Sequence, residues 1–414
     1  MSRCVTLDEY NNATGLNLTK TGLWNNPKSW LAIYESSSEE RMLEISKFLE
    51  DMGYKVKTHW VSLLNYKNVL DEIVASSNQG ECKPVIMNLA WGEDLYDGCL
   101  GLTFIKALEK TGLPYTGGDS KFYSTGNSKF ISKPLFQQYG VPTAPFVVLH
   151  NDSMEEDIKQ AEELFGYPMI VKADKSYSSL LLNDKSLVYN TQSLKTRALS
   201  IWDAAMGHVL VEKFVAGREF TVHVAQLFDE ESGEFVYHVY DALEREFVDS
   251  KSGTRDKQFF HWHDIFESFV EKHPEVNNPT KISSCHLEEI YGNNASNDSF
   301  EFKMAPAESQ TVLKEIALNA FKTVSGQSYG RADIRAEMPS SIANASWKEV
   351  NFYVLEMNAH PDITPLTDSP FGVLAKFIDG RQKGPSVVQF LEGIIHTAIH
   401  LNKASFNKPS LKEL

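Results

Sequence analysis

The sequence predicts a protein of mixed α/β and α+β class, with an N-terminal α/β unit, a small central unit and a larger C-terminal unit. Three observations support this fold class. The chain has 414 residues, more than one ordinary hydrophobic core holds. Strands and helices alternate in its first third, as in a parallel sheet with helices on its faces. After residue 140 the strands become short and closely spaced, as in an antiparallel sheet.

The N-terminal unit is predicted at residues 29–125, after a polar, asparagine-rich arm at 1–28. Apolar residues at helical spacing, followed by a glycine that can cap the helix, give its clearest element at 38–56. The expected elements are strands at 29–36, 61–65 and 84–91, and helices at 38–56 and 66–75.

The central unit is predicted at residues 126–228, as a small antiparallel sheet with helices. Its longest strand signals are apolar runs bounded by glycine, proline or asparagine. The expected strands are 140–149, 167–174, 179–183, 186–190, 208–215 and 218–228, and the expected helices are 154–166 and 191–206.

The C-terminal unit is predicted at residues 229–414. Residues 240–305 are polar and without clear periodicity, so we expect long loops there with one short helix, as a loop inserted at about 245–305. A helix at 307–324, strands at 329–337 and 351–358, and an amphipathic helix at 386–402 complete this unit.

Composition excludes several classes of protein. A net charge of −15 argues against a general nucleic-acid binder, which needs a basic surface. The four cysteines are scattered without metal-ligand or disulfide spacing, which favours a reducing compartment. No apolar signal segment or run of 18 apolar residues is present, so we expect a cytoplasmic protein without membrane contact.

Polar residues interrupt two apolar strands near the C-terminus. Glu356 and Asn358 lie two residues apart in VLEMN, so their side chains point to the same face of a strand. Backbone groups or an arginine often satisfy such a pair. Together with Asp333 of GRADI, however, they offer three oxygen ligands of the kind that Mg²⁺ prefers. Arg331 shares a strand face with Asp333 and would neutralise negative charge there.

Three other charged residues occupy apolar strands. Lys172 ends MIVK, where a lysine is also expected to extend to solvent. Glu212 in VLVEKF and Glu219 in GREFTV are open to the same two interpretations. No P-loop, dinucleotide-binding GxGxxG or GxSxG motif is present.

The order of these motifs resembles that of the ATP-grasp carboxylate–amine ligases, and within them the D-alanine–D-alanine ligase-like enzymes. The resemblance extends over residues 30–370. It implies an ATP-grasp fold with an N-terminal parallel-sheet domain, a small central lid and a C-terminal catalytic domain. The matching segments are SSEERMLEIS, NLAWGEDLYDG, LEKTGLPYTGGD, SKFISKPLFQQYGVPTAPFVVL, GYPMIVKADKSYSSLLL, VLVEKFVAGREFTV, GRADI and VLEMNAHPDITP.

The resemblance also implies ATP and two Mg²⁺ ions as ligands. The residues implied to bind ATP are Lys129 and Lys172 at the phosphates, Glu212 and the backbone of Lys213, Phe214 and Val215 at adenine, and Glu219 at the ribose. The implied metal ligands are Asp333, Glu356 and Asn358, with Glu356 bridging the two ions.

On the substrate side, the resemblance implies that ATP phosphorylates a carboxylate and that an amine then attacks the acyl-phosphate. Arg331 would stabilise the tetrahedral transition state, while Glu40 and Ser178 would orient the ammonium group of the first amino acid. The implied partners are a small amino acid and a carboxylate, and a homodimer is the family expectation.

The chain departs from the family pattern at the substrate side. In DKSYSSLLL, Tyr177 and Leu181 replace glycines of the lid loop, which predicts a stiffer lid. Trp91 stands where the family has a histidine, Asp362 replaces the glycine of a Pro-Gly-Met-Thr loop, and Thr367 corresponds to a serine that binds a substrate carboxylate.

Two further features of the pattern stay open. The lysine of the family's Ω-loop has no clear counterpart, and Lys251, Arg255 and Lys257 are the candidates. The aromatic and histidine residues at 259–263 fit either loop packing or the wall of a pocket for something larger than alanine.

The departures predict an ATP-dependent, ADP-forming ligase that joins a pair other than two D-alanines. Enzymes that attach an amino acid to a mycosporine core show similar drift. A non-catalytic ATP-binding sensor on the same scaffold is the alternative, and a phosphotransferase that stops at the phosphorylated substrate is a third interpretation.

Overall fold

The computed structural model describes most of the chain outside its N-terminal arm and its long polar loop. Several sequence predictions lie outside the described residues: the arm at 1–28 apart from residues 2–3, the strand at 29–36, Ser178, Thr367 and the loop residues 251–263. The described ranges are 2–3, 39–80, 84–94, 99–176, 181–203, 207–247, 300–338, 347–365, 369–381 and 386–406.

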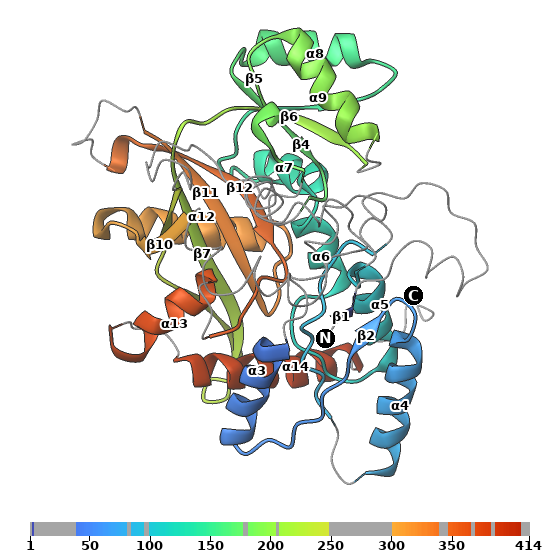
Figure 1. Ribbon diagram of the computed structural model, residues 1–414. Coiled ribbons are helices and arrows are strands. Elements are labelled where there is room, and N and C mark those ends of the chain that lie inside the picture. The colour runs from blue at the N-terminus through green and yellow to red at the C-terminus, as the bar shows by residue number, and fades with distance from the viewer. Residues whose placement is uncertain are drawn as a thin grey trace, which may run out of the picture.

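A four-stranded antiparallel sheet forms the small lobe at the top of Figure 1. Its strands, in spatial order, are β3 (Phe146–Leu149), β6 (Val209–Lys213), β4 (Met169–Ala173) and β5 (Leu187–Val188). Helices α8 (Met154–Leu164) and α9 (Thr191–Asp203) pack on it and bury an apolar core. The 3-10 turn η1 (Asp184–Ser186) leads into β5. This confirms an antiparallel sheet in the central unit, but the strand predicted there at 218–228 is wrong in its place, because it pairs within the larger sheet.

A six-stranded antiparallel sheet forms the middle of the molecule (Figure 1). Its spatial order is β10 (Phe300–Met304), β9 (Leu243–Phe247), β7 (Gly217–Asp229), β11 (Tyr329–Glu337) and β12 (Asn351–Asn358), with β8 (Glu234–Val239) paired to β7. The turn η4 (Trp347–Glu349) precedes β12. The mixed fold class is thereby confirmed.

The prediction of loops at 240–305 is wrong for β9 and β10. FEFKM of β10 alternates apolar and charged residues, whereas LEREF of β9 has three charged residues in a row, and the two strands pair in register. The guanidinium of Arg245 in β9 lies 5.1 and 5.0 Å from the ring centroids of Phe300 and Phe302. The high charge of β9 hid a strand that pairing with β10 and β7 makes evident.

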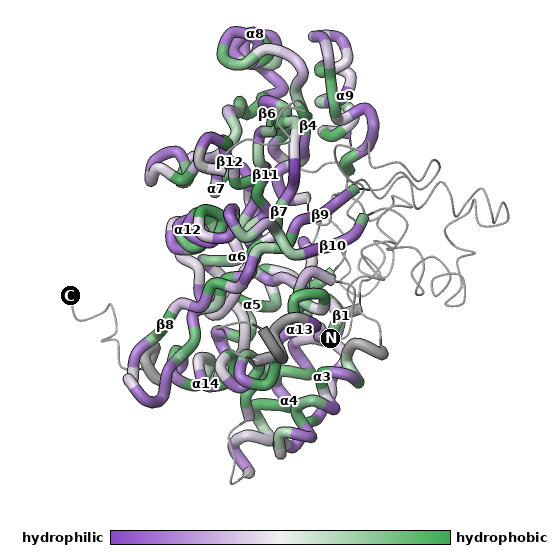
Figure 2. Tube along the Cα trace, turned by 90° about the vertical axis from the view of Figure 1, so that its left-hand side faces the viewer, coloured by the Kyte–Doolittle hydropathy of each residue, from purple (hydrophilic) through white to green (hydrophobic). Residues whose placement is uncertain are grey.

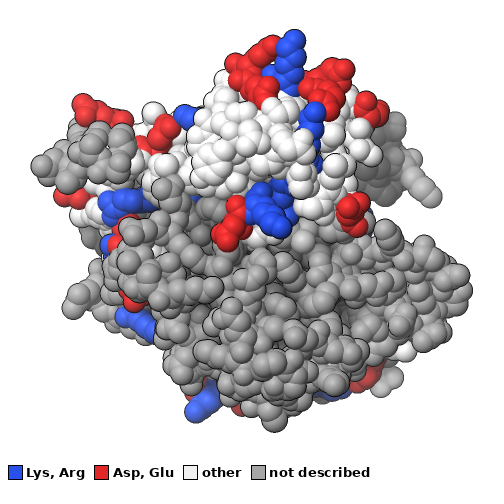
Figure 3. All heavy atoms as spheres, turned by 45° about the horizontal axis from the view of Figure 1, so that its top comes forward, with Lys and Arg blue, Asp and Glu red and all other residues white. Residues whose placement is uncertain are grey.

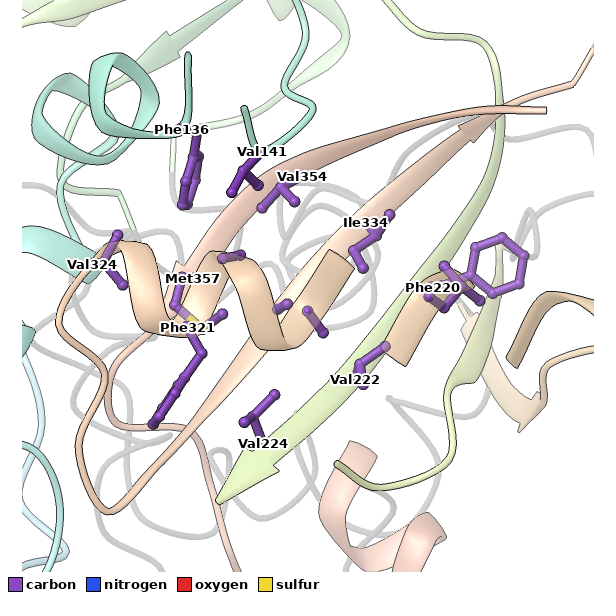
Figure 4. Packing of buried hydrophobic residues seen from close by; sticks show 14 of the residues in the cluster. Phe136, Val141, Phe220, Val222, Val224, Phe321, Val324, Ile334, Val354 and Met357 are labelled. Carbon is purple, nitrogen blue, oxygen red and sulfur yellow. The ribbon is translucent and has the colours of Figure 1, made fainter. Parts of the chain in front are cut away.

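Helix α12 (Ala307–Thr323) covers one face of the large sheet. Phe321 of the helix belongs to the same buried cluster as Val222, Ile334 and Met357, which come from three strands (Figure 4). The opposite face packs at one end on α13 (Pro370–Arg381), α14 (Val387–Phe406) and α3 (Glu39–Asp51). The other end of that face carries charged residues and forms the candidate site.

The N-terminal unit is mainly helical in its described part. The expected helices are present as α3 and α4 (Tyr66–Gln79), and Gly53 after α3 has a φ of 88°, as its capping role predicts. Both helices alternate hydrophilic and hydrophobic stretches (Figure 2). Three helices follow them: α5 (Leu102–Thr111), α6 (Ser120–Gly126) and α7 (Lys129–Gln138).

Parallel pairing in this unit occurs at two places among the described residues. One is between β1 (Ser2–Arg3) and β2 (Val61–Ser62), and the other is a single bridge from Ile86 to Tyr115. The prediction of a continuous strand at 84–91 is therefore wrong beyond that bridge.

Two predictions from composition meet the structure here. Cys99 is disulfide-bonded, although the spacing of the cysteines indicated no disulfide. Within the described ranges, no helix has both the length and the apolar composition needed to cross a membrane. On the small lobe, acidic and basic side chains are interspersed (Figure 3), which is unlike a continuous basic nucleic-acid surface.

Candidate active site

Antiparallel pairing brings the predicted metal ligands together. Asp333 of β11 lies opposite Glu356 of β12, and Arg331 lies opposite Asn358. The strand β7 lies on the other side of β11, with Thr221 opposite Asp333. The alternation of side chains along these strands therefore places the polar groups on one face of the sheet, at the end that α13 and α14 leave uncovered.

Asp333 is held by hydrogen bonds to both carboxylate oxygens. Its Oδ1 accepts from the Thr221 hydroxyl at 2.8 Å and from Arg331 Nε at 3.0 Å. Its Oδ2 accepts from a second Arg331 nitrogen at 3.0 Å and from the Asn358 amide at 3.1 Å. Burial opposes ionisation of Asp333, but the charges of Arg331 and Arg245 outweigh it and hold the pKa of this carboxyl below its ordinary value.

Lys129 forms an ion pair with Glu356, with 2.9 Å between Nζ and Oε2. Its ammonium also donates to the backbone carbonyls of Ser176, at 2.9 Å, and Asp174, at 3.4 Å. Burial favours the neutral amine, but the Glu356 carboxylate outweighs this effect and raises the pKa of Lys129. Lys129 therefore stays charged and links α7 to both β12 and the loop after β4.

Glu212 lies in a buried cluster with two lysines. Its Oε2 is 3.1 Å from Lys172 Nζ and 3.5 Å from Lys133 Nζ. Its Oε1 is buried and has no hydrogen-bond partner among the described residues. Lys172 thus pairs with Glu212 rather than extending to solvent, while Lys133 was not identified from the sequence. Burial is the main cause that lowers the pKa of Lys133 to about 8.

Glu219 is paired with two arginines from the neighbouring strands. Arg245 Nη1 lies 3.1 Å from Glu219 Oε1, and Arg335 Nη2 lies 3.6 Å from Glu219 Oε2. Both arginines stand opposite Glu219 in the strand register. Sequence reasoning missed Arg245 because its strand was assigned to a loop, and the three consecutive charged residues of LEREF show no strand pattern.

The segment that joins the two sheets begins at the end of β6. The N–H of Lys213 donates to the Pro145 carbonyl at 2.9 Å, and that of Phe214 donates to the Pro168 carbonyl at 3.1 Å. Phe214 and Val215 are buried, whereas Lys213 reaches Glu337 at the end of β11, 2.9 Å away. This segment runs between the sheets, where the resemblance predicts adenine.

A second group of polar residues lies beside Arg331. His223 of β7 stands opposite Arg331 of β11 in the register. Tyr329 lies two residues before Arg331, on the same face of β11. His223 Nε2, the Tyr329 hydroxyl and His360 Nδ1 are buried and have no hydrogen-bond partner in the described ranges. Burial lowers the pKa of His223 to about 3 and of His360 to about 4, so both imidazoles are neutral.

Asp362 follows the end of β12 and is held by Thr364, whose N–H and hydroxyl donate to Asp362 Oδ1 at 2.9 and 2.5 Å. Burial opposes the charged form of Arg331, but the charge of Asp333, and after it those of Glu356 and Asp362, raise the pKa of this guanidinium.

The remaining predicted residues are only partly described. Trp91 is half-buried in a loop whose next residue, Gly92, accepts a 2.6 Å hydrogen bond from the Tyr123 hydroxyl. Glu40 lies in the first turn of α3, and its side chain is outside the described part. Leu181 has a φ of 63°, a left-handed conformation that glycine adopts more readily. Pro134 lies inside α7.

The side chains that the structure brings together fit a magnesium ion that also has phosphate and water ligands. No group of three or more His, Cys, Asp or Glu side chains in the described ranges is placed to hold a metal. Asp333 and Glu356 with the amide of Asn358 supply hard oxygen donors, but too few for the six ligands of Mg²⁺. Such a partial donor set is typical of ions bound together with a nucleotide.

Comparisons with known proteins agree with this architecture. A model of the family described as D-ala D-ala ligase C-terminus matches residues 135–257. A D-alanine–D-alanine ligase of Psychrobacter is 25% identical over 298 residues, covering 72% of this chain and 70% of the relative. An uncharacterized protein y4sG of Sinorhizobium fredii is 26% identical over 315 residues, covering 76% and 74%.

Two solved structures of D-alanine–D-alanine ligase from Bacillus anthracis share the fold at 17% sequence identity. One has a TM-score of 0.56 and covers 89% of this chain and 96% of that chain. The other, complexed with ATP, has a TM-score of 0.54 and covers 88% and 93%. The two antiparallel sheets and these matches give the chain an ATP-grasp fold. Its sequence is similar to those of D-alanine–D-alanine ligases.

Proposed function

We propose that the chain is an ATP-dependent, ADP-forming ligase that activates a carboxylate and couples it to the amine of a small amino acid. The observation that carries this proposal is the meeting of Asp333, Glu356 and Asn358 on one sheet face, with Arg331 and Lys129 bonded to the two carboxylates. In the reaction, the γ-phosphoryl group of ATP moves to a carboxylate oxygen and ADP leaves. The amine then attacks the acyl carbon, losing a proton, and phosphate leaves.

The charged groups of the site have complementary tasks in this proposal. Asp333, Glu356 and Asn358 would hold Mg²⁺, which supplies charge neutralisation at the phosphates of ATP. Lys129 and Lys172 would hold phosphate oxygens, and Glu219 the ribose. Arg331, fixed by two hydrogen bonds to Asp333, would stabilise the oxyanion that develops on the acyl carbon.

We propose that the substrates differ from two D-alanines. His223, Tyr329 and His360 offer buried polar atoms beside Arg331, and a methyl group would leave these atoms without hydrogen bonds. A substrate with hydroxyl, amide or ring nitrogen groups would satisfy them. Cores of the mycosporine type belong to this class, since they bear hydroxyl groups. Trp91, Asp362 and Thr367 are the other residues that we assign to substrate contacts.

The domain boundaries follow the same proposal. We assign substrate binding to residues 29–125, the lid to 126–228 and the catalytic domain to 229–414. Glu40 of the substrate-binding unit and Ser178 of the lid would meet at the ammonium group of the first amino acid when the two units close. We also propose a homodimer, on the family expectation.

The second candidate function is a nucleotide sensor without turnover. Leu181 favours it, because its left-handed backbone in the lid loop restricts the movement that glycine would permit. A sensor binds ATP with or without a second ligand and releases no ADP.

The deciding experiment measures ADP release from ATP and Mg²⁺ across single and paired amino acids and fractionated metabolites, with Glu356→Gln as the blank. A ligase releases ADP only with two substrates, and mass spectrometry identifies the joined product. A phosphotransferase needs one substrate and gives a stable phosphorylated product. ATP binding with no release across the panel supports the sensor.

A further inference from the structure

Lys133 is a buried lysine to which neither the motif resemblance nor the proposed reaction assigns a role. Its side chain is fully buried, and its ammonium lies 2.7 Å from Thr143 Oγ1 and 3.5 Å from Glu212 Oε2. The ring of Phe146 packs below it, with its centroid 5.3 Å from Nζ. A buried ammonium is costly unless its partners are well placed, so this site is built around the charge.

The two lysines of the cluster contact the same oxygen of Glu212. Lys172 and Lys133 both lie within 3.5 Å of Oε2, whereas Oε1 is buried and accepts no hydrogen bond from the described residues. The carboxylate is therefore clamped at one oxygen, which fixes the direction of the other. A fixed acceptor of this kind pairs with a ligand that presents an N–H donor at that point and disfavours one that presents a carbonyl.

The cluster of Lys133, Lys172 and Glu212 is also connected by hydrogen bonds to β12, the strand that carries the proposed metal ligands Glu356 and Asn358. Thr143 donates its hydroxyl to the Val354 carbonyl of β12 at 3.0 Å, and the Val354 N–H donates to Pro142 at 2.8 Å. Two residues further along β12 stands Glu356, the partner of Lys129. Lys129 and Lys133 are four residues apart on α7, so one face of this helix contacts both the Glu212 cluster and β12.

We propose that Lys133 is a positioning residue that fixes Glu212 so that its free oxygen selects an amino-bearing nucleobase. This inference rests on the proposed function, because it assigns ATP to the site between the sheets. Adenine carries an exocyclic amine where guanine carries a carbonyl. With Lys133 in place, the fixed Oε1 accepts from the amine and repels the carbonyl. Without it, Glu212 is free to rotate or to take up a proton, and the discrimination falls.

The test compares ATP and GTP binding to the full chain, by calorimetry with Mg²⁺, for the wild type and Lys133→Met. Methionine keeps the length of the side chain and removes its charge. We expect the dissociation constant for ATP to rise about 10-fold or more and that for GTP to change little, so that their ratio falls. Lys159→Met, on the exposed face of α8, is the matched control and leaves both constants unchanged.

Thr143→Val keeps the test informative if Lys133→Met does not fold. It removes the hydroxyl that orients Lys133 and should reduce the ATP preference in the same direction, by a smaller factor. Equal weakening of ATP and GTP would show a general structural role and overturn the proposal, as would unchanged constants in both variants. If the wild type binds neither nucleotide, the proposed function itself fails, and the inference fails with it.

Discussion

At the scale of single residues, each carboxylate of the candidate site is paired with a particular cation. Glu356 pairs with Lys129, Asp333 with Arg331, Glu212 with Lys172 and Lys133, and Glu219 with Arg245 and Arg335. Removing one member of a buried pair leaves the other charge uncompensated, which is costly. The site is consequently sensitive to single substitutions that keep its shape and change its charge.

Glu356→Gln is the sharpest of these substitutions. It keeps the size of the side chain but weakens the proposed metal ligand and the ion pair with Lys129. We expect ATP-dependent turnover to fall on the order of 10²-fold or more. ADP release measures this, once the substrates are known from the panel. Glu349→Gln changes an exposed glutamate just before β12 and should leave turnover unchanged; a similar loss in both variants would contradict the assignment.

The lowered pKa of Lys133 predicts that the stability of the folded chain depends on pH. Its pKa is about 8 in the folded chain and 10.5 as the ordinary value. Between these values the unfolded chain binds more protons, so the contribution of Lys133 to stability rises with pH from about 8 to 10.5. The free energy of unfolding of the wild type should therefore increase relative to Lys133→Met, by roughly 1–3 kcal/mol between pH 7.5 and 10.

Urea unfolding of both proteins at several pH values measures this difference. Other groups that titrate at alkaline pH affect both proteins alike and cancel in the comparison. A difference that is independent of pH would mean that Lys133 has an ordinary pKa in the folded chain.

Side-chain alternation along the strands made the proposed metal ligands predictable, but it did not predict their ion-pair partners. Asp333 and Asn358 share a face once the strands pair, as the two-residue period requires. The partner of Glu356, however, comes from α7, far away in the sequence, and its choice depends on how the helix packs. The register shift between Asp333 and Ile334 also has no signature in the sequence.

At the scale of elements, the long antiparallel strands were predictable and the charged edge strands were not. The strands β7, β11 and β12 carry apolar residues on the face that packs on α12, which gives a strong signal. In β9 and β10, Glu244, Glu246 and Lys303 share one face, and Lys303 pairs with both glutamates across the strands. Glu244 is buried and also pairs with Arg218. Cross-strand ion pairs of this kind stabilise the strand pairing and leave no hydrophobic pattern in the sequence.

Two glycines near the ends of β7 should differ in how much their substitution by alanine destabilises the chain. Gly217 has a φ of 146°, and a Cβ there would lie 2.0 Å from the Ala336 carbonyl oxygen of β11. Gly233, in the turn before β8, has a φ of 72° and no atom within 4 Å of a built Cβ. Gly217→Ala should cost about 3 kcal/mol or more of unfolding free energy, from strain and overlap together.

Gly233→Ala is the matched control, because it carries only the backbone strain and should cost about 1–2 kcal/mol. Chemical denaturation of both variants gives the two values. Equal costs would indicate that β7 and β11 separate easily at this end, which would weaken the placement of Glu219 two residues further on.

At the scale of the whole molecule, the candidate site depends on contacts between the two sheets. The segment after β6 joins the small sheet to the large one, and Lys213 pairs with Glu337 across the junction. The Thr143 hydroxyl donates to the Val354 carbonyl, and the Val354 N–H donates to the Pro142 carbonyl. The residues that we assign to nucleotide binding are divided between the sheets: Lys172 and Glu212 lie on the small one, and Asp333 and Glu356 on the large one.

This division predicts where ATP should protect the chain. A ligand that contacts both sheets couples their local opening, so amide hydrogen exchange should slow in β4, β6, β11 and β12 together when ATP and Mg²⁺ are added. At a concentration 100 times the dissociation constant, the stabilisation should be about 2.7 kcal/mol. Helix α4 lies away from these strands and serves as the internal control (Figure 1). With EDTA in place of Mg²⁺, protection of β11 and β12 should be lost first, because their contribution passes through the metal ligands. Protection confined to one sheet would place the nucleotide elsewhere and remove the basis for assigning Lys172 and Glu356 to the same site.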